Sequence, residues 1–411
     1  MHLPPFRSAS GPGLRPFTRL ALSAALLSGA ALVTPAAAFE PTGNEIADTY
    51  LTLLESGQNE TVTVGKVEAS GDVVTLSDLL FVNNGDDGTR LSIDTNTLKG
   101  ATIEADGRLT IETLALQGIR ITDKQDTTVT AATAEARDVT LPSVEDVRAE
   151  RGLEGKSMYR EVDVDTIRID NKDGRHVTVG HLGVRLDDLR EGVAHKGSLE
   201  VSDLNLPLDA FDPKGRAQIR ALGYSEVNLG LKAAVGWAPE TSTLTIESLH
   251  VDARDMASLD LSLTAGGVTK PLMDKLQAVS ALKPSREEQQ KLQQELLQSV
   301  TVNSITLDLV NHGLYERVIE LQAQGQGVSR QDLEKQLGIV LPMALVQIQD
   351  TELRRQAQEA LTAFLATPGS LRATATPATP PVIGVLMGAG MMAPNSLPGL
   401  LGLKVEANPA N

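Results

Sequence analysis

The sequence predicts a mainly β (α+β) protein: a curved, elongated antiparallel sheet of bulged amphipathic strands, with a helical hairpin insertion and a helical C-terminal part. Two observations predict this fold. A short apolar pattern with the period of a strand recurs along the chain, and helical periodicity is confined to the segment after residue 43 and to the chain after residue 267. Turn sequences such as Asp106-Gly107 and residues 170–174 separate successive copies, which favours strands joined locally as a meander.

The recurring pattern places apolar residues at positions 1, 3, 6 and 8 of an eight-residue stretch. Each half alternates with a period of two, so each half is a strand with one apolar face. The central step of three would turn the second half over, and one extra residue in a β-bulge restores the phase. Two short strands on different sheets, joined at the step, would give the same pattern. Copies begin at Val62, Val74, Leu109, Val129, Val162, Val177, Leu199, Leu244 and Val300.

The intervening positions predict a second face that lies in water. They are mostly Thr, Ser, Asp, Glu and Arg, and no acid occupies an apolar position of the pattern. Asp209 and Asp212 follow this rule, because they come after Leu208 and are interpreted as the turn that ends a strand.

Helices are expected at both ends of the strand region, residues 39–267. Residues 44–55 have one apolar helical face and are expected to cover the sheet as an N-terminal lid. Residues 268–299 predict a helical hairpin, whose first helix is capped by Thr269. A further strand and several helices are expected over residues 300–372.

The tail, residues 373–411, is rich in Pro, Gly and Met and has no charged residue between Arg372 and Lys404. Because it lacks a helical period, we expect a final strand and a loop that fold back over the open sheet. The alternative is a flap lined by Met387, Met391 and Met392 over an apolar groove, since methionine suits adaptable surfaces.

Residues 1–38 have the order of a secretory signal peptide. Three arginines precede an apolar run over residues 20–33, and Ala36-Ala37-Ala38 offers small residues for cleavage. The run is shorter than the roughly 20 residues of a membrane helix, so we expect cleavage rather than a retained anchor. The chain is therefore expected in the periplasm, with no stable transmembrane span after cleavage.

Composition excludes several functions. The chain has no cysteine, which rules out disulfides, thiolate chemistry and cysteine-ligated metals. A formal net charge of −16 disfavours nucleic acids and anionic lipid heads. Aromatic residues make up only 3% of the chain, with Trp237 the single tryptophan, which argues against sites that stack bases or sugars.

The sequence predicts neither an enzyme nor a cofactor or metal site. It contains no paired-histidine zinc motif, nucleophile elbow or dinucleotide fingerprint. His176 and His181 lie five positions apart, which places them on opposite faces of one strand. Asp163 and Asp165 share a face, and we interpret them as solvated acids near a turn.

Two stretches carry a resemblance to known proteins: LGYSEVNLGLKAAVGWAPETSTLTIESLHVDARDMASLDLSL and FLATPGSLRATATPATP. They resemble uncharacterised β-rich periplasmic proteins of Gram-negative bacteria and, more distantly, AsmA-like and YdgA-like β-groove proteins. The likeness is one of pattern over most of residues 60–375. It implies an elongated curved sheet whose apolar inside holds acyl chains, and a role in envelope lipid handling.

Two functions therefore compete. The first is a periplasmic protein that binds lipid or another apolar ligand along a β-groove, and the second is a self-filled scaffold that contacts envelope proteins and takes no ligand. The discriminating feature is whether six apolar residues face packed helices or an unfilled channel. These candidate ligand-binding residues are Leu204, Leu206, Leu249, Val251, Ile305 and Leu307.

Overall fold

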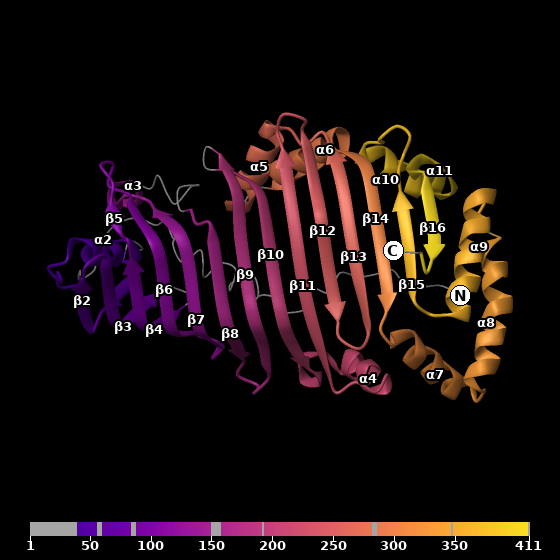
Figure 1. Ribbon diagram of the computed structural model, residues 1–411, viewed down its shortest axis with the longest axis horizontal. Helices are drawn as coiled ribbons and strands as arrows, with labels where there is room; N and C mark the ends of the chain where they lie inside the picture. The colour runs from indigo at the N-terminus through magenta and orange to yellow at the C-terminus, as the bar shows by residue number, and fades with distance from the viewer. Residues whose placement is uncertain are drawn as a thin grey trace. The chain divides into compact units, whose positions relative to one another are not determined.

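A computed structural model describes residues 39–55, 60–83, 88–148, 158–190, 193–281, 286–346 and 348–409 (Figure 1). The expected signal peptide, residues 1–38, lies outside them. The chain divides into two compact units, Met1–His176 and Val177–Asn411, called here the N-terminal unit and the C-terminal unit. Each is mainly β, its strands pair antiparallel, and the later strands are interrupted by helices, which confirms the predicted fold class.

The N-terminal unit is a sheet with the order β1-β3-β4-β6-β7-β8, with β2 added to β3 and β5 to β6. Two helices accompany it, α2 (Glu45–Leu54) and α3 (Val144–Arg148). The strands are β1 (Glu60–Thr63), β2 (Lys66–Ser70), β3 (Val73–Asn83), β4 (Arg90–Lys99), β5 (Thr102–Ile103), β6 (Leu109–Thr122), β7 (Thr128–Leu141) and β8 (Glu161–Asp170).

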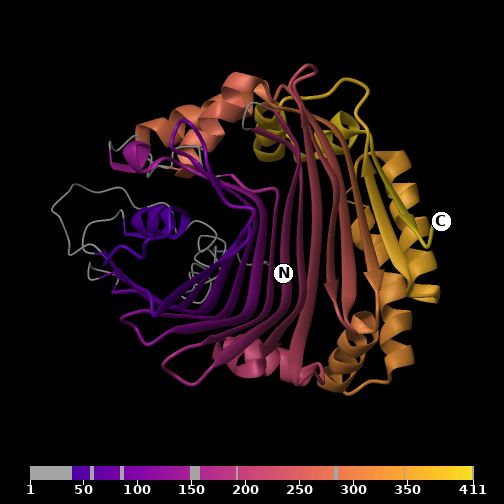
Figure 2. The same cartoon turned by 60° about the vertical axis from the view of Figure 1, so that its left-hand side comes forward.

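Helix α2 covers the apolar face of this sheet, as predicted for the N-terminal lid (Figure 2). Asn44 caps the helix by accepting a hydrogen bond from the Ala47 backbone N–H at 3.0 Å. Leu51 of the helix and Leu76 of β3 are both completely buried. The Tyr50 hydroxyl accepts a hydrogen bond from buried Asn96 at 3.0 Å, and burial raises the pKa of Tyr50. The N-terminal unit therefore fills its own core.

The C-terminal unit is an eight-stranded meander in which β9 to β16 follow one another in sequence order. Helix α4 (Pro213–Ala221) follows β10, and the hairpin α5–α6 (Lys270–Ala281, Arg286–Ser299) separates β13 from β14. Helices α7 to α9 (Leu314–Gln326, Arg330–Leu345, Thr351–Ala366) separate β14 from β15. The strands are β9 (His176–Arg190), β10 (Val193–Pro207), β11 (Glu226–Ala238), β12 (Thr243–Ala253), β13 (Ala257–Gly266), β14 (Thr301–Asn311), β15 (Ser370–Ala375) and β16 (Leu403–Ala407).

The helical hairpin packs on one end of these strands around Trp237. The indole N–H donates to the Val268 carbonyl at 2.8 Å, and Leu272 of α5 is almost fully buried beside it. Lys275 and Glu295 join α5 to α6 at 2.6 Å.

The bulges expected at the step of three are present. In β3, β8 and β10 the residue before the third apolar position has a left-handed φ, at Asp78 (54°), Thr166 (53°) and Asp203 (52°). Register shifts accompany the step in β10 and β12. The first copy has no such bulge, because the chain breaks near Gly65 into two strands, β1 and β2. The two strands nevertheless pair with the same neighbour, β3, rather than joining different sheets.

One expectation about local structure was wrong, and one helix was not predicted. The tail is not a strand and a loop: helix α10 (Ile383–Met392) and the short α11 (Leu397–Leu401) lie between β15 and β16. Prolines flank α10 without interrupting it, and its apolar residues surround the axis, so it has no one-sided period to detect. Helix α4 was also missed, although Asp212 caps it by accepting from the Gly215 N–H at 2.7 Å.

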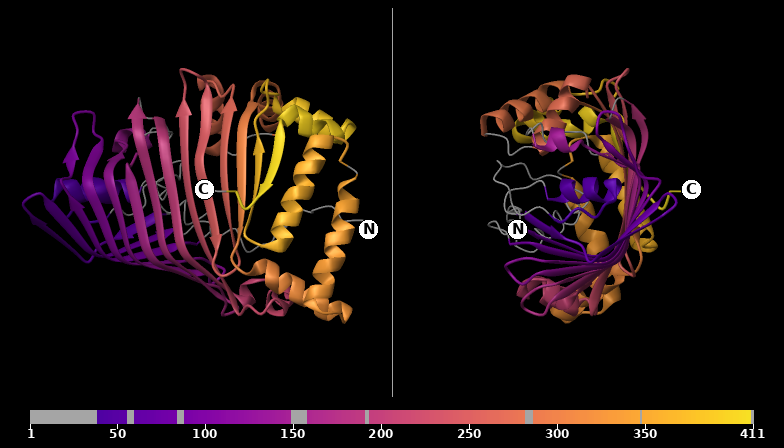
Figure 3. Two further views of the ribbon diagram at one scale, coloured as in Figure 1. Left: turned by 45° about the vertical axis from the view of Figure 1, so that its right-hand side comes forward. Right: turned by 90° about the vertical axis from the view of Figure 1, so that its left-hand side faces the viewer.

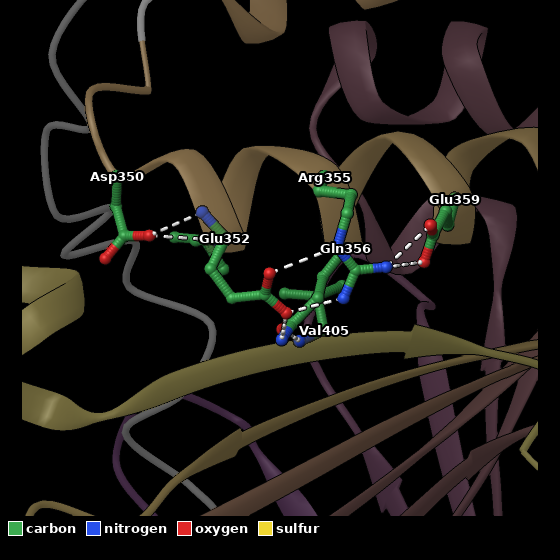
Figure 4. Close-up of polar contacts among 7 residues, drawn as sticks. Asp350, Glu352, Arg355, Gln356, Glu359 and Val405 are labelled. Atoms are coloured by element: carbon green, nitrogen blue, oxygen red, sulfur yellow. Dashed lines mark hydrogen bonds and ion pairs between the residues drawn. The ribbon is translucent and has the colours of Figure 1, made fainter.

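Helix α9 covers the free edge of β16 (Figure 3). Asp350 caps α9 by accepting from the N–H groups of Glu352 and Leu353, and Arg355 pairs with Glu352 and Glu359 (Figure 4). The Gln356 side-chain oxygen accepts from the Val405 N–H of β16 at 3.4 Å. The edge strand is thereby shielded from pairing with another strand.

The left-handed bulge residue of β10 gives a test of the backbone. We expect Asp203→Val to be less stable to unfolding by urea than Asp203→Gly, by about 1–2 kcal/mol, because only glycine adopts this φ without strain. Both variants lose the ion pair to Arg254, so that contribution cancels. Asp252 is an ordinary strand position of β12, and there the valine variant should be more stable than the glycine variant. Equal stabilities of the two Asp203 variants would contradict the bulge.

The ion pairs of α9 predict a shifted titration. Hydrogen bonds from Arg355 lower the pKa of Glu352 from 4.5 to about 2. A depressed carboxyl pKa stabilises the folded state above pH 4.5, and this contribution disappears as the pH falls from 4.5 toward 2. Carboxyl NMR should show Glu352 titrating near 2, and nearer its ordinary value in Arg355→Gln or at high salt, because the pair is exposed. An unchanged midpoint in Arg355→Gln would refute the pairing.

Candidate functional site: an open apolar sheet face

Two rows of aliphatic residues cross all eight strands of the C-terminal unit. They follow directly from the strand registers, in which each member lies opposite the next. Together they are called the open apolar face. The first row is Val184, Leu199, Ala233, Leu249, Leu261, Leu307, Ala373 and Val405, and the second is Leu182, Val201, Leu231, Val251, Leu259, Leu309, Leu371 and Ala407.

No member of either row is buried, although each has apolar neighbours within the sheet. Leu199, Leu307 and Leu309 are 36%, 37% and 40% exposed. Cross-strand neighbours shield a side chain from the sides, so exposure of this size means that the face itself is in contact with solvent. In the N-terminal unit, by contrast, apolar strand residues such as Leu76 of β3 and Leu98 of β4 are completely buried.

Helices cover the ends of the strands rather than the rows between them. The hairpin α5–α6 covers one end, where Leu244 and Leu263 pack around Trp237. Helices α4 and α7 lie at the opposite end (Figure 1). There Arg317 stacks over the ring of Tyr224 and donates to the Leu222 carbonyl at 3.1 Å. Within the described residues, helices therefore close the ends of the open apolar face, α9 lies along β16, and the row leucines of β10 and β14 stay exposed.

The six candidate residues from the sequence all belong to the C-terminal unit, and none is buried. Leu249, Val251 and Leu307 are members of the two rows. The other three lie in neighbouring cross-strand pairs, which are Leu204 with Leu229, Leu206 with Val227, and Ile305 with Leu263.

Sequence reasoning missed the contributions of β13 and β15. Leu259, Leu261 and Leu263 alternate without the step of three, so they do not match the recurring pattern. Leu371 belongs to a strand of six residues, too short for the whole pattern. Strict period-two alternation over residues 257–265 was the signal that would have found the first group.

The opposite face of the same strands carries a row of charges. Glu200, Lys232, His250, Asp260, Asp308 and Arg372 lie opposite one another across β10 to β15. They form three close pairs: Lys232 with Glu200 at 2.9 Å, His250 with Asp260 at 2.7 Å, and Arg372 with Asp308 at 2.6 Å. This face is in water, as predicted.

A shallow depression of about 270 Å³ lies around Gly230 on β11. Four of its charged side chains have partners: Asp203 pairs with Arg254 at 2.8 Å, and Lys232 and His250 belong to the charge row.

Metal and membrane criteria give negative findings for the described ranges. Within them, no three His, Asp or Glu side chains come together as a metal site would require. Asp170, near the acids singled out in the sequence, is held by Arg168 at 2.7 Å, which lowers its pKa. No helix in this part of the chain has the length and apolar character needed to cross a bilayer.

Comparison with known proteins gives one similarity. A family model with the description "Uncharacterized protein" matches residues 250–408, which extend from β12 through β16. A search of the curated proteins finds no match. The matched region contains α7 to α11 and the part of the open apolar face contributed by β13 to β16.

Proposed function

We propose that the chain is an exported, non-enzymatic protein of the bacterial envelope that binds lipid or a similar apolar ligand along the open apolar face. The observation that carries this proposal is the pair of aliphatic rows that stay in contact with solvent across eight strands. Contiguous apolar surface of this kind usually marks a binding site.

The composition of the rows favours an aliphatic ligand. Every member is Val, Leu or Ala, so the rows supply no side-chain hydrogen bonds and no aromatic ring for stacking. With neighbouring strands about 4.8 Å apart, each row extends roughly 34 Å. That length is close to the roughly 30 Å hydrocarbon thickness of a bilayer, so a row accommodates extended acyl chains.

The free energy gained when a ligand covers the rows depends on how exposed their side chains are. Full burial of a leucine contributes roughly 1.5–3 kcal/mol, so covering one that is about 40% exposed contributes about 1 kcal/mol. Covering the three leucines that are 36–40% exposed, Leu199, Leu307 and Leu309, gains about 3 kcal/mol before the cost of association, and the less exposed members add smaller amounts. The apolar face alone therefore supports moderate affinity and exchange of the ligand.

The sheet edge disfavours a peptide as the ligand. Recognition by strand addition needs free N–H and C=O groups on an edge strand, and α9 covers the edge of β16. The order of residues 1–38, which is typical of a secretory signal peptide, supports the export that is part of this proposal.

A self-filled scaffold remains the second candidate, because one observation favours it. In the N-terminal unit, α2 covers the apolar face with Tyr50, Leu51 and Leu53, all of them buried. That unit has the architecture expected of a structural module without a ligand.

Native mass spectrometry with lipid extraction tests the proposal. The chain purified from a Gram-negative periplasm should carry phospholipid or fatty acid at a fixed ratio. The variants Leu307→Asp and Leu309→Asp should lower lipid occupancy about tenfold or more, because each places a charge on the open apolar face. Both residues are more than one-third exposed, so the fold should tolerate the change.

The matched control is Val318→Asp on α7, where the valine is 38% exposed and lies outside the two rows. This variant should keep its lipid. A clean lipid-free mass for the wild-type chain, with no lipid gained on titration, would refute the proposal in favour of the scaffold.

A further inference from the structure

The connection between β15 and β16, residues 376–402, exposes apolar side chains to solvent. It contains α10 and α11 and has no charged residue. At the end of α10, Met391 and Met392 are 81% and 87% exposed, and Val385 and Met387 are about half exposed. A helix that is apolar on all sides and open to solvent at one end requires a partner that is itself uncharged.

The base of this connection is held firmly. The Ile383 N–H donates to the Val300 carbonyl at 2.9 Å, and the Val302 N–H donates to the Pro381 carbonyl at 3.0 Å. Gly384 lies so close to α6 that a Cβ there would be 2.8 Å from the Leu297 carbonyl oxygen. Helix α10 therefore projects from a fixed base.

The polar groups at its outer end bond to one another. The Ala393 N–H donates to the Ala389 carbonyl at 2.7 Å, which closes the helix. The N–H and the hydroxyl of Ser396 both donate to the Ala393 carbonyl, at 2.9 and 2.8 Å. Backbone groups satisfied within a segment are a requirement for entering hydrocarbon, where water is absent.

We propose that the outer end of α10, with Met391 and Met392, inserts into the surface of a zwitterionic lipid membrane. The lack of charge favours lipid over a protein as the partner. This segment has no charged group that would lose its water on entering a membrane, whereas a protein interface surrounds its apolar centre with a polar rim. The net charge of −16 repels anionic headgroups, which restricts the surface to zwitterionic lipid.

This inference rests on the proposed function and deepens it. The connection joins the two strands that contribute Ala373 and Val405 to the first aliphatic row. Insertion of α10 would bring the open apolar face next to the membrane that supplies its ligand.

Flotation with phosphatidylcholine vesicles tests the insertion. The wild-type chain should float with these vesicles, and less with phosphatidylglycerol vesicles. Met391→Asp and Met392→Asp should weaken vesicle binding about tenfold or more, because aspartate in hydrocarbon costs more than a factor of ten. Met343→Asp on α8 is the matched control, since Met343 is 70% exposed on another helix, and it should bind like wild type.

Three results would overturn the inference: a wild-type chain that stays free of vesicles, equal effects of Met391→Asp and Met343→Asp, or a dimer that Met391→Asp dissociates without any vesicle binding. Lipid extraction of the same preparations separates the two proposals. A chain that carries lipid but does not float refutes only the membrane contact, and one that floats without extractable lipid refutes only the ligand-binding face.

Discussion

The constraint on which the structure depends is the phase of side chains along each strand. A strand that gains one residue without correction moves all later side chains to the other face of the sheet. In β3, β8 and β10 a bulge residue with left-handed φ absorbs that extra residue, at Asp78, Thr166 and Asp203. Aspartate and glycine tolerate this conformation, but threonine does not adopt it readily, so Thr166 is the most strained of the three. Because the phase is kept, aliphatic residues from eight consecutive strands meet in rows and charged residues meet on the reverse face.

The two units use this arrangement differently. In the N-terminal unit, one short helix with Tyr50, Leu51 and Leu53 covers the apolar face, and Asn96 is drawn into the core to bond Tyr50. In the C-terminal unit, the helices cover the strand ends around Trp237 and the edge at Val405. The same amphipathic strand therefore gives a closed core in one case and an open surface in the other. The difference lies in where the connections place their helices.

The sequence predicted the class of fold and the positions of most strands because alternation and the step of three are local signals. It also predicted helices within residues 300–372, where α7 to α9 lie. It did not predict α10, because a helix that is apolar on all sides has no stripe. Three of the six candidate residues, Leu249, Val251 and Leu307, belong to the two rows. The contribution of β13 was not predicted, since Leu259 and Leu261 lack the step that defined the search.

An apolar surface in contact with water carries a risk of self-association, and the C-terminal unit limits that risk in three ways. Helix α9 shields the last strand, so chains cannot add to it edge to edge. The reverse face is held in close ion pairs such as Arg372 with Asp308, which keeps it hydrated. The net charge of −16 makes copies repel one another at long range, while that repulsion does not act on a neutral ligand. These three features discriminate against another copy of the chain without obstructing an uncharged aliphatic molecule, as the proposed binding of an apolar ligand requires.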